Sequence, residues 1–416
     1  MLLRAYAVSA LPILVKAIIG ILLLRVLVEY LGKQGLGQVS QFQSAVLLIY
    51  GLLNAIFFNH IAKNNWTDKA PNTDIQFNKL LGLIFIFSLA ISITILCNAE
   101  LLSNHFFGDN RIRTALLSLA ATTPLIGLFV AYSGRACADN RLASYNLYNA
   151  LALLLSTIII YYSTLLYGQN GAFIGISLYY VFPMLFAAYV VLRNRTDKKS
   201  FLPSLKRINS YPIKSIAKIG FIGVFSALNS LLLQMFMRNQ LAEQSDWDTV
   251  GDWQAITKVS ESYLLLATTP LTTFLLPKIT QQKTILDRKS LINKTLSIGI
   301  AITLSTGLTV FYLWNTIIIK IIGESFLDLN HLLPTQITGD IFKVIVWTYS
   351  IAAIAKEKYK IAFISEIIYA ISYIGLAFYF LPKTQLQGAF STYLFAYLIS
   401  AIYLVFSYNK YIKNEQ

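Results

Sequence analysis

The chain has few charged side chains for its length. Asp, Glu, Lys and Arg make up only 13% of its 416 residues, while 56% are hydrophobic and the mean hydropathy is +0.60. A soluble domain carries about 25% charged residues. Half of that charge cannot cover a water-exposed surface of this size, so the composition excludes a water-soluble enzyme and indicates a membrane protein.

Residues that build metal and catalytic sites are also scarce. The chain has two cysteines and three histidines, and the histidines lack metal-ligand spacing. The glycine-rich phosphate loop and the short motifs of zinc proteases and serine hydrolases are missing too. We therefore predict no metal site, no cofactor and no catalytic residue, and an ATP-driven pump within this chain is excluded.

Long apolar windows fill most of the sequence. A helix needs about 20 apolar residues to cross a bilayer, and in lipid only helices satisfy the backbone polar groups of segments this long. The windows predict an all-α polytopic membrane protein with 12 transmembrane helices, at residues 6–29, 38–62, 79–98, 113–134, 144–166, 171–192, 217–241, 251–276, 292–313, 335–355, 361–382 and 387–408.

The basic residues are unevenly divided between the predicted loops. Of the 34 Lys and Arg residues, 23 fall in the set of loops that contains both termini, and 5 fall in the opposite set. Cytoplasmic loops carry the excess of Lys and Arg in membrane proteins, so both termini are predicted in the cytoplasm. This topology accounts for the net charge of +15, and we expect no nucleic-acid partner.

A basic segment divides the chain into halves of similar length. Residues 193–216 form the longest polar connection, which we interpret as a cytoplasmic linker between an N-terminal six-helix lobe, 1–192, and a C-terminal six-helix lobe, 217–416. Gly37 follows the first span and Gly251 follows the seventh, so each half has a glycine before its second span. Because six is an even number of spans, the halves would be parallel repeats.

Several basic residues lie inside predicted spans, where a charge costs about 2.5–3.5 kcal/mol on insertion scales. Lys16 is near the middle of the first span without an acid within one turn, which favours a cavity-facing side chain over an ion pair or snorkelling. Arg25 has Glu29 at i+4, so a local pair and a cavity role are equally open. Arg238 lies close to the outer end of the seventh span, where snorkelling is the alternative.

Charged residues of the second half come in pairs of opposite sign. Lys258 and Glu261 in the eighth span, and Asp340 and Lys343 in the tenth, are each three residues apart. Such pairs lower the cost of insertion, which we favour, or form part of a proton or ion relay. Glu366 lies five residues into the eleventh span, within reach of lysines at its cytoplasmic end.

Several motifs resemble those of a known family. The stretch Ser245–Gln254 (SDWDTVGDWQ), continuing to Phe274–Pro277 (FLLP), resembles the corresponding region of Wzx-type flippases for O-antigen and lipid III. Gly339–Val344 (GDIFKV) followed by Ile354–Lys356 (IAK), and the Gly35–Gly37 turn after a Lys-bearing first helix, match as well. The resemblance covers essentially the whole chain, and the block 245–277 is its most specific part.

Wzx-type flippases belong to the multidrug/oligosaccharidyl-lipid/polysaccharide exporter superfamily. The resemblance implies a MATE-like fold, in which two six-helix lobes form a V and open alternately to each side. It implies a transporter of the bacterial inner membrane that moves an undecaprenyl-diphosphate-linked oligosaccharide, with membrane lipids, a polysaccharide polymerase and a chain-length regulator as partners. The basic cavity residues of the family correspond to Lys16, Arg25 and Arg238, which would bind the diphosphate.

Two other functions stay open. A drug or cation antiporter of the same superfamily would need acids in its cavity, whereas the first six spans offer Lys16 at mid-span and no acid there. A membrane enzyme that acts on lipid-linked sugar generally needs a larger external loop with acids or histidines, and the predicted external loops are short.

The basic bias gives a direct test of the topology. Single cysteines placed at Ser200 and Ser245 in a cysteine-free background should react oppositely with an impermeant thiol reagent added to whole cells. We expect Ser245→Cys to label at once and Ser200→Cys to label only after permeabilisation, because the excess of basic residues stays in the cytoplasm. Equal labelling from outside would contradict the twelve-span topology.

Overall fold

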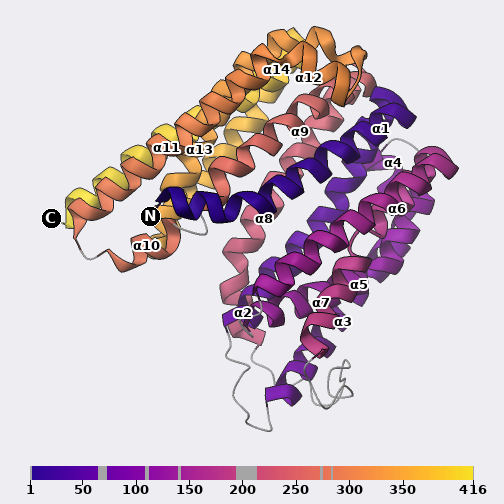
Figure 1. The fold of residues 1–416 in the computed structure, drawn as a ribbon, viewed down its shortest axis with the longest axis horizontal. Coiled ribbons are helices and arrows are strands. Elements are labelled where there is room, and N and C mark those ends of the chain that lie inside the picture. The colour runs from indigo at the N-terminus through magenta and orange to yellow at the C-terminus, as the bar shows by residue number, and fades with distance from the viewer. Residues whose placement is uncertain are drawn as a thin grey trace. The chain divides into compact units, whose positions relative to one another are not determined.

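The computed structural model describes residues 2–63, 73–107, 112–138, 142–193, 213–271, 275–282 and 284–415, and this part of the chain is helical almost throughout (Figure 1). Its elements in chain order are α1 (Leu2–Leu53), the π-helix η1 (Asn54–Phe58), α2 (Asn59–Lys63), α3 (Thr73–Cys97), α4 (Ala99–Phe107), α5 (Ile112–Ala138), α6 (Leu142–Ser177), α7 (Val181–Leu192), α8 (Ile213–Gln244), α9 (Trp247–Pro270), α10 (Leu276–Gln281), α11 (Ile285–Tyr312), α12 (Trp314–Ile321), the 3₁₀-helix η5 (Glu324–Leu332), α13 (Leu333–Ala355) and α14 (Tyr359–Glu415).

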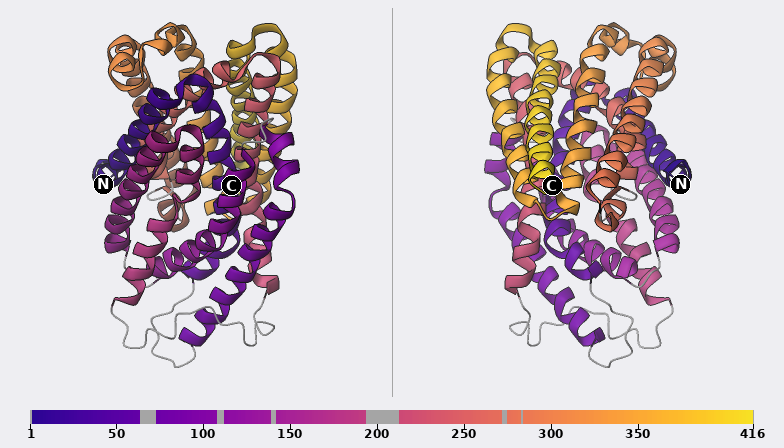
Figure 2. Two further views of the ribbon diagram at one scale, coloured as in Figure 1. Left: turned by 90° about the vertical axis from the view of Figure 1, so that its right-hand side faces the viewer. Right: turned by 90° about the vertical axis from the view of Figure 1, so that its left-hand side faces the viewer.

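Three of these helices contain a sharp bend, and each bend separates two predicted spans. The bends are at Gly32 in α1 (φ 66°), Gly168 in α6 (φ 57°) and Gln385 in α14 (φ 42°). Across the bend of α14 its two halves run side by side (Figure 2). The Ser365 and Ser400 hydroxyls are 2.8 Å apart. The bends fall where the sequence predicts short turns between spans.

The described residues include seven stretches that are long and apolar enough to cross a membrane. Because three of them contain a bend, these stretches hold ten of the predicted spans. The other two predicted spans correspond to α8 and α9. Helix α9 is more polar because it carries Asp248, Asp252, Lys258 and Glu261. The arrangement agrees with the predicted all-α polytopic membrane protein.

The chain divides into two compact units. One unit comprises residues 1–37 and 235–416, and the other comprises residues 38–234. The helices α1 and α8 therefore each contribute to both units. This grouping differs from the predicted lobes 1–192 and 217–416, which stay a prediction.

Each unit packs around a central helix. In the unit 38–234, α5 lies between α3, α6 and α7, and Ser92 of α3 donates a 2.6 Å hydrogen bond to the Ala120 carbonyl of α5. In the other unit, α13 packs against α9, α11 and α14 (Figure 1). Hydroxyl groups satisfied by neighbouring helices are the usual way to keep polar side chains inside a membrane bundle.

A short turn joins α8 to α9. Asp246 is the N-cap of α9, and its carboxylate accepts a 2.7 Å hydrogen bond from the backbone amide of Thr249. That hydrogen bond lowers the pKa of Asp246 below its ordinary value, so the cap stays charged at neutral pH.

The bend of α1 packs against this turn. The Lys33 ammonium forms a 2.7 Å ion pair with Asp252 and lies 5.0 Å from the centre of the Phe326 ring. The approach depends on Gly251, where a Cβ atom would lie 2.2 Å from the Lys33 carbonyl oxygen. Gly37 packs in turn on Val250 and the carbonyl of Trp247. The sequence suggests the turns at Gly37 and Gly251 as repeats of each other. In the structure, each of these glycines packs against residues of the other turn.

This contact predicts that Gly251→Ala destabilises the protein. The new methyl group would push against backbone, which cannot rotate away, and overpacking of this kind costs about 1–3 kcal/mol. Gly375→Ala is the matched control, because a Cβ at Gly375 in α14 meets nothing within 4 Å. Thermal unfolding of both purified variants in detergent checks the difference, and equal midpoints would contradict the close packing.

Candidate functional site

A buried carboxylate lies at the centre of the unit 1–37 with 235–416. Asp340 of α13 is fully buried, and its Oδ2 atom accepts hydrogen bonds from the hydroxyls of Ser260, at 2.7 Å, and Tyr263. Its Oδ1 atom accepts from the Gln336 amide at 3.0 Å and from the Tyr393 hydroxyl at 2.7 Å. Four donors from α9, α13 and α14 therefore offset the cost of burying this acid.

The local sequence explains how the donors converge. Ser260 and Tyr263 are three residues apart on one face of α9, and Gln336 precedes Asp340 by one helical turn. Gly339 lets α14 come close, because a Cβ there would lie 2.5 Å from the Tyr393 ring. The Gly-Asp pair in GDIFKV thus combines the buried acid with the space for its partner.

Lys343 follows Asp340 by three residues, but its side chain lies against aromatic rings. Its ammonium lies 5.7 Å from the ring centres of Trp347 and Tyr393 and 5.8 Å from that of Tyr397. Among the described residues, no ion pair within 4.0 Å joins Asp340 to Lys343, although the two side chains lie within electrostatic range of each other. Both carboxylate oxygens accept hydrogen bonds from neutral donors, and the aromatic faces stabilise the lysine in addition to the nearby acids.

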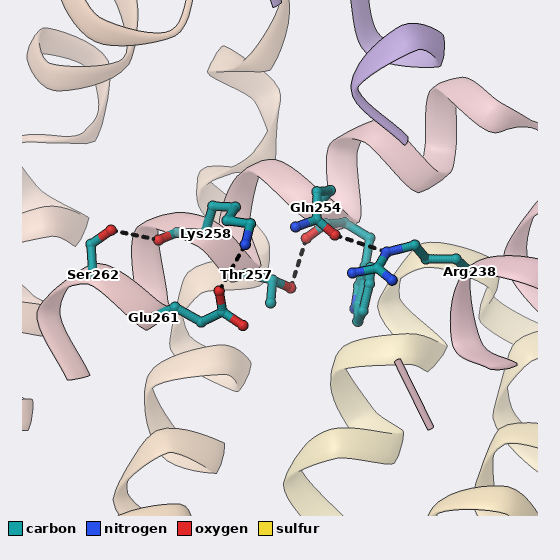
Figure 3. A network of polar contacts seen from close by, with 7 residues as sticks. Arg238, Gln254, Thr257, Lys258, Glu261 and Ser262 are labelled. Carbon is teal, nitrogen blue, oxygen red and sulfur yellow. Dashed lines mark hydrogen bonds and ion pairs between the residues drawn. The ribbon is translucent and has the colours of Figure 1, made fainter. Parts of the chain in front are cut away.

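The other expected pair is present on the opposite face of α9. The Lys258 ammonium is 3.2 Å from the Glu261 carboxylate (Figure 3). Glu261 also lies within electrostatic range of Lys343 and Arg238. Glu261 therefore lies among three cations, which come from α8, α9 and α13.

Arg238 of α8 is buried rather than at the interface. Only 1% of its surface is exposed. Its Nε atom donates a 3.0 Å hydrogen bond to Gln254, and its guanidinium lies 5.4 Å from the centre of the Trp253 ring (Figure 3). The side chain is held by an amide and an aromatic face of α9, and the snorkelling alternative does not describe it.

The structure shows fewer contacts for the other predicted residues, Lys16, Arg25 and Glu366. Lys16 belongs to α1, but its side chain lies outside the described residues. Arg25 is 3.6 Å from Glu29, and both side chains are more than half exposed, where such a pair contributes little to stability. Glu366 is half-buried on α14. The binding and coupling roles of all eight predicted residues stay predictions.

Sequence reasoning missed the neutral members of the site. Ser260, Tyr263, Gln336 and Tyr393 carry no charge, so nothing marks them among the many hydroxyl groups of an apolar sequence. The spacing of Ser260 and Tyr263 in α9 puts both hydroxyls on one face of the helix. This spacing indicates a shared site only once Asp340 is known to lie opposite that face. Among the described residues, no group of His, Cys, Asp and Glu side chains could hold a metal ion.

The chemistry of this arrangement suits an anion. Arg238, Lys258 and Lys343 supply three positive charges in membrane-spanning helices, against the two negative charges of Glu261 and Asp340. These five side chains therefore carry one more positive than negative charge. A surplus of positive charge in a low-dielectric region attracts a phosphate group more strongly than it would in water.

Known proteins resemble this chain over nearly its whole length. It is 23% identical over 400 residues to the lipid III flippases of Escherichia coli (strain K12) and Shigella flexneri, and the match covers 94% of this chain and 94% of each relative. The resemblance noted in the sequence is thereby confirmed. No family model matches the chain.

Solved transporters have the same architecture. An inward-facing MATE family transporter of the MOP superfamily aligns with a TM-score of 0.76 and 17% identity, over 97% of this chain and 95% of that one. The chain shares the fold of this transporter. The lipid II flippase MurJ, in an inward closed conformation, aligns equally well, with a TM-score of 0.76 and 18% identity over 97% of this chain and 87% of MurJ. The similarity to these two transporter structures confirms the predicted MATE-like fold class.

The Asp340 site predicts a stability difference between two neighbouring serines. Ser260→Ala removes a donor from a buried carboxylate, and hydrogen bonds to charged groups contribute about 1.5–3 kcal/mol. Ser262→Ala is the matched control in the same helix, since its hydroxyl donates only to the Lys258 carbonyl one turn earlier. We expect a lower unfolding midpoint in detergent for Ser260→Ala alone, and equal midpoints would show that Asp340 does not need this donor.

Proposed function

We propose that the chain is a flippase that moves an undecaprenyl-diphosphate-linked oligosaccharide, of the O-antigen or lipid III type, from the cytoplasmic to the periplasmic leaflet. The observation that carries the proposal is the near full-length match to lipid III flippases. The MOP-type fold and the surplus of positive charge near Arg238, Lys258 and Lys343 support it, because a diphosphate needs compensating cations when it leaves water.

The proposal includes the cellular setting. The protein would lie in the bacterial inner membrane with both termini and the 193–216 linker in the cytoplasm. Its two lobes, 1–192 and 217–416, would open alternately to each side around the substrate. A polysaccharide polymerase and a chain-length regulator would act on the product after transport, and no chemical change of the substrate is part of the step.

A drug or cation antiporter is the second candidate, because MATE transporters share the fold. A cationic drug needs an acid that is free to pair with it. Here Asp340 is enclosed by four donors and Glu261 is paired with Lys258, so neither acid suits that role. Dye resistance on over-expression would favour the antiporter, and its absence together with lipid-linked glycan transport would favour the flippase.

We also propose that the ionisable residues of the second half couple transport to a proton or ion. Lys258 with Glu261, Asp340 with Lys343, and Glu366 would change protonation or partner as the lobes move. Replacing both Lys258 and Glu261 by leucine should then abolish flipping while membrane abundance stays normal, since a purely structural pair tolerates apolar replacement. Unimpaired flipping in this variant would remove the pair from the mechanism.

Lys16 provides the test of diphosphate binding. Loss of a charged partner for phosphate costs about 1.5–3 kcal/mol, so Lys16→Ala should reduce flipping roughly tenfold or more. Lys16→Arg should keep a substantial part of the activity, and Lys16→Glu should be the worst because it repels the diphosphate. Arg25→Ala should lose less, because the exposed Arg25 side chain already pairs with Glu29.

The measurement is the amount of lipid-linked oligosaccharide that reaches the outer leaflet of proteoliposomes or cells, with the membrane level of each variant as control. If Lys16→Glu transports like the parent chain, the diphosphate does not use Lys16. A chemically altered lipid-linked sugar in the same vesicles would favour the membrane enzyme instead.

A further inference from the structure

A groove lies at one end of the unit 1–37 with 235–416, apart from the charged residues of the proposed transport site. It has a volume of about 530 Å³ and is lined by the first turns of α11, by Tyr349 of α13 and by the last turns of α14. This volume falls in the range of roughly 300–1,000 Å³ that is typical of small-molecule sites. Nothing in the proposed flippase function assigns a role to it.

The groove has an apolar part and a polar part. Its floor is the pair Tyr349 and Tyr408, whose ring centres are 5.7 Å apart. Leu286, 76% exposed, lies at its edge beside Ile285. A leucine as exposed as this one is suited to contact an acyl chain rather than water.

The polar part of the groove is lined by side chains that donate hydrogen bonds. The Lys289 ammonium and the amides of Asn293 and Asn409 line it, and none of the lining residues is acidic. Lys289 and Asn293 are one turn apart on α11 and face Asn409 on α14. Ammonium and amide N–H groups are the donors that bind phosphate oxygens.

The predicted spans place the groove at the depth of lipid headgroups. The predicted spans begin at residue 292 in α11 and end at residue 408 in α14, so the lining residues 285–293 and 408–412 are at the limits of these spans. The basic residues Arg288 and Lys410 are close in the sequence to the lining residues. Each basic residue near an anionic leaflet contributes about 1 kcal/mol of attraction.

We propose that this groove binds the headgroup and first acyl carbons of an anionic phospholipid from the adjacent leaflet. The phosphate accepts hydrogen bonds from Lys289, Asn293 and Asn409, and the acyl carbons lie on Ile285 and Leu286. The volume fits a headgroup with its glycerol and leaves the acyl tails in the bilayer. Such a lipid would join α11 to α14 at their common end.

Binding of phosphatidylglycerol and phosphatidylcholine with identical acyl chains to the full chain in detergent tests the proposal. We expect the parent protein to prefer phosphatidylglycerol, and Lys289→Gln to weaken its binding about fivefold, as expected for one lost cation. Lys294→Gln is the matched control, because it removes the same charge from α11 five residues along, at a position outside the groove lining, and should leave binding within about twofold.

Two further variants separate a built site from surface attraction. Asn409→Leu removes a donor from the groove without changing net charge and should also weaken binding, while Lys289→Arg should preserve it. Equal losses in Lys289→Gln and Lys294→Gln, or equal binding of the two lipids to the parent, would overturn the proposal.

Undecaprenyl diphosphate serves as the competitor. If it displaces phosphatidylglycerol and itself loses affinity in Lys289→Gln, the groove belongs to the transported lipid, and the proposal is wrong. Lipid binding is measured without transport, so failure of the flippase proposal leaves this result unaffected. Unchanged unfolding midpoints confirm that the variants are folded.

Discussion

A charge inside a membrane helix must be stabilised by the protein, and the burial of Asp340 shows how this constraint organises the unit 1–37 with 235–416. Its four donors come from α9, α13 and α14, so the carboxylate fixes the rotation of all three helices relative to one another. Removing the acid would leave buried hydroxyl and amide groups without their shared acceptor, and removing a donor would leave part of a buried charge unsatisfied.

The same constraint gives α9 two different faces. Ser260 and Tyr263 face Asp340, while Gln254, Lys258 and Glu261 recur at i, i+4 and i+7 on the other side. The inner face stabilises the bundle, and the outer face presents ionisable groups beside Arg238 (Figure 3). One helix thus carries both the structural core and the proposed transport chemistry, which is why its sequence is more polar than that of a simple membrane span.

The motifs that link this chain to the Wzx-type flippases coincide with these contacts. The block SDWDTVGDWQ contains the cap Asp246, the ion-pair partner Asp252, and Trp253 and Gln254, which hold Arg238. GDIFKV contains Gly339, Asp340 and Lys343. The residues that carry the resemblance therefore lie where helices must approach closely or where a charge must be satisfied.

The sequence by itself determined the membrane class, the predicted spans and the ionisable residues inside them, because hydropathy and charge are local properties of a segment. It also identified the glycines of the two turns, since a glycine between apolar windows is visible without any contact. The partners were decided only by the tertiary structure. Asp340 and Lys343 are three residues apart, yet one is satisfied by neutral donors up to 80 positions away and the other by aromatic faces. Which neighbours a side chain reaches depends on the packing of helices distant in sequence, and hydroxyl or amide donors have no pattern that reveals this packing beforehand.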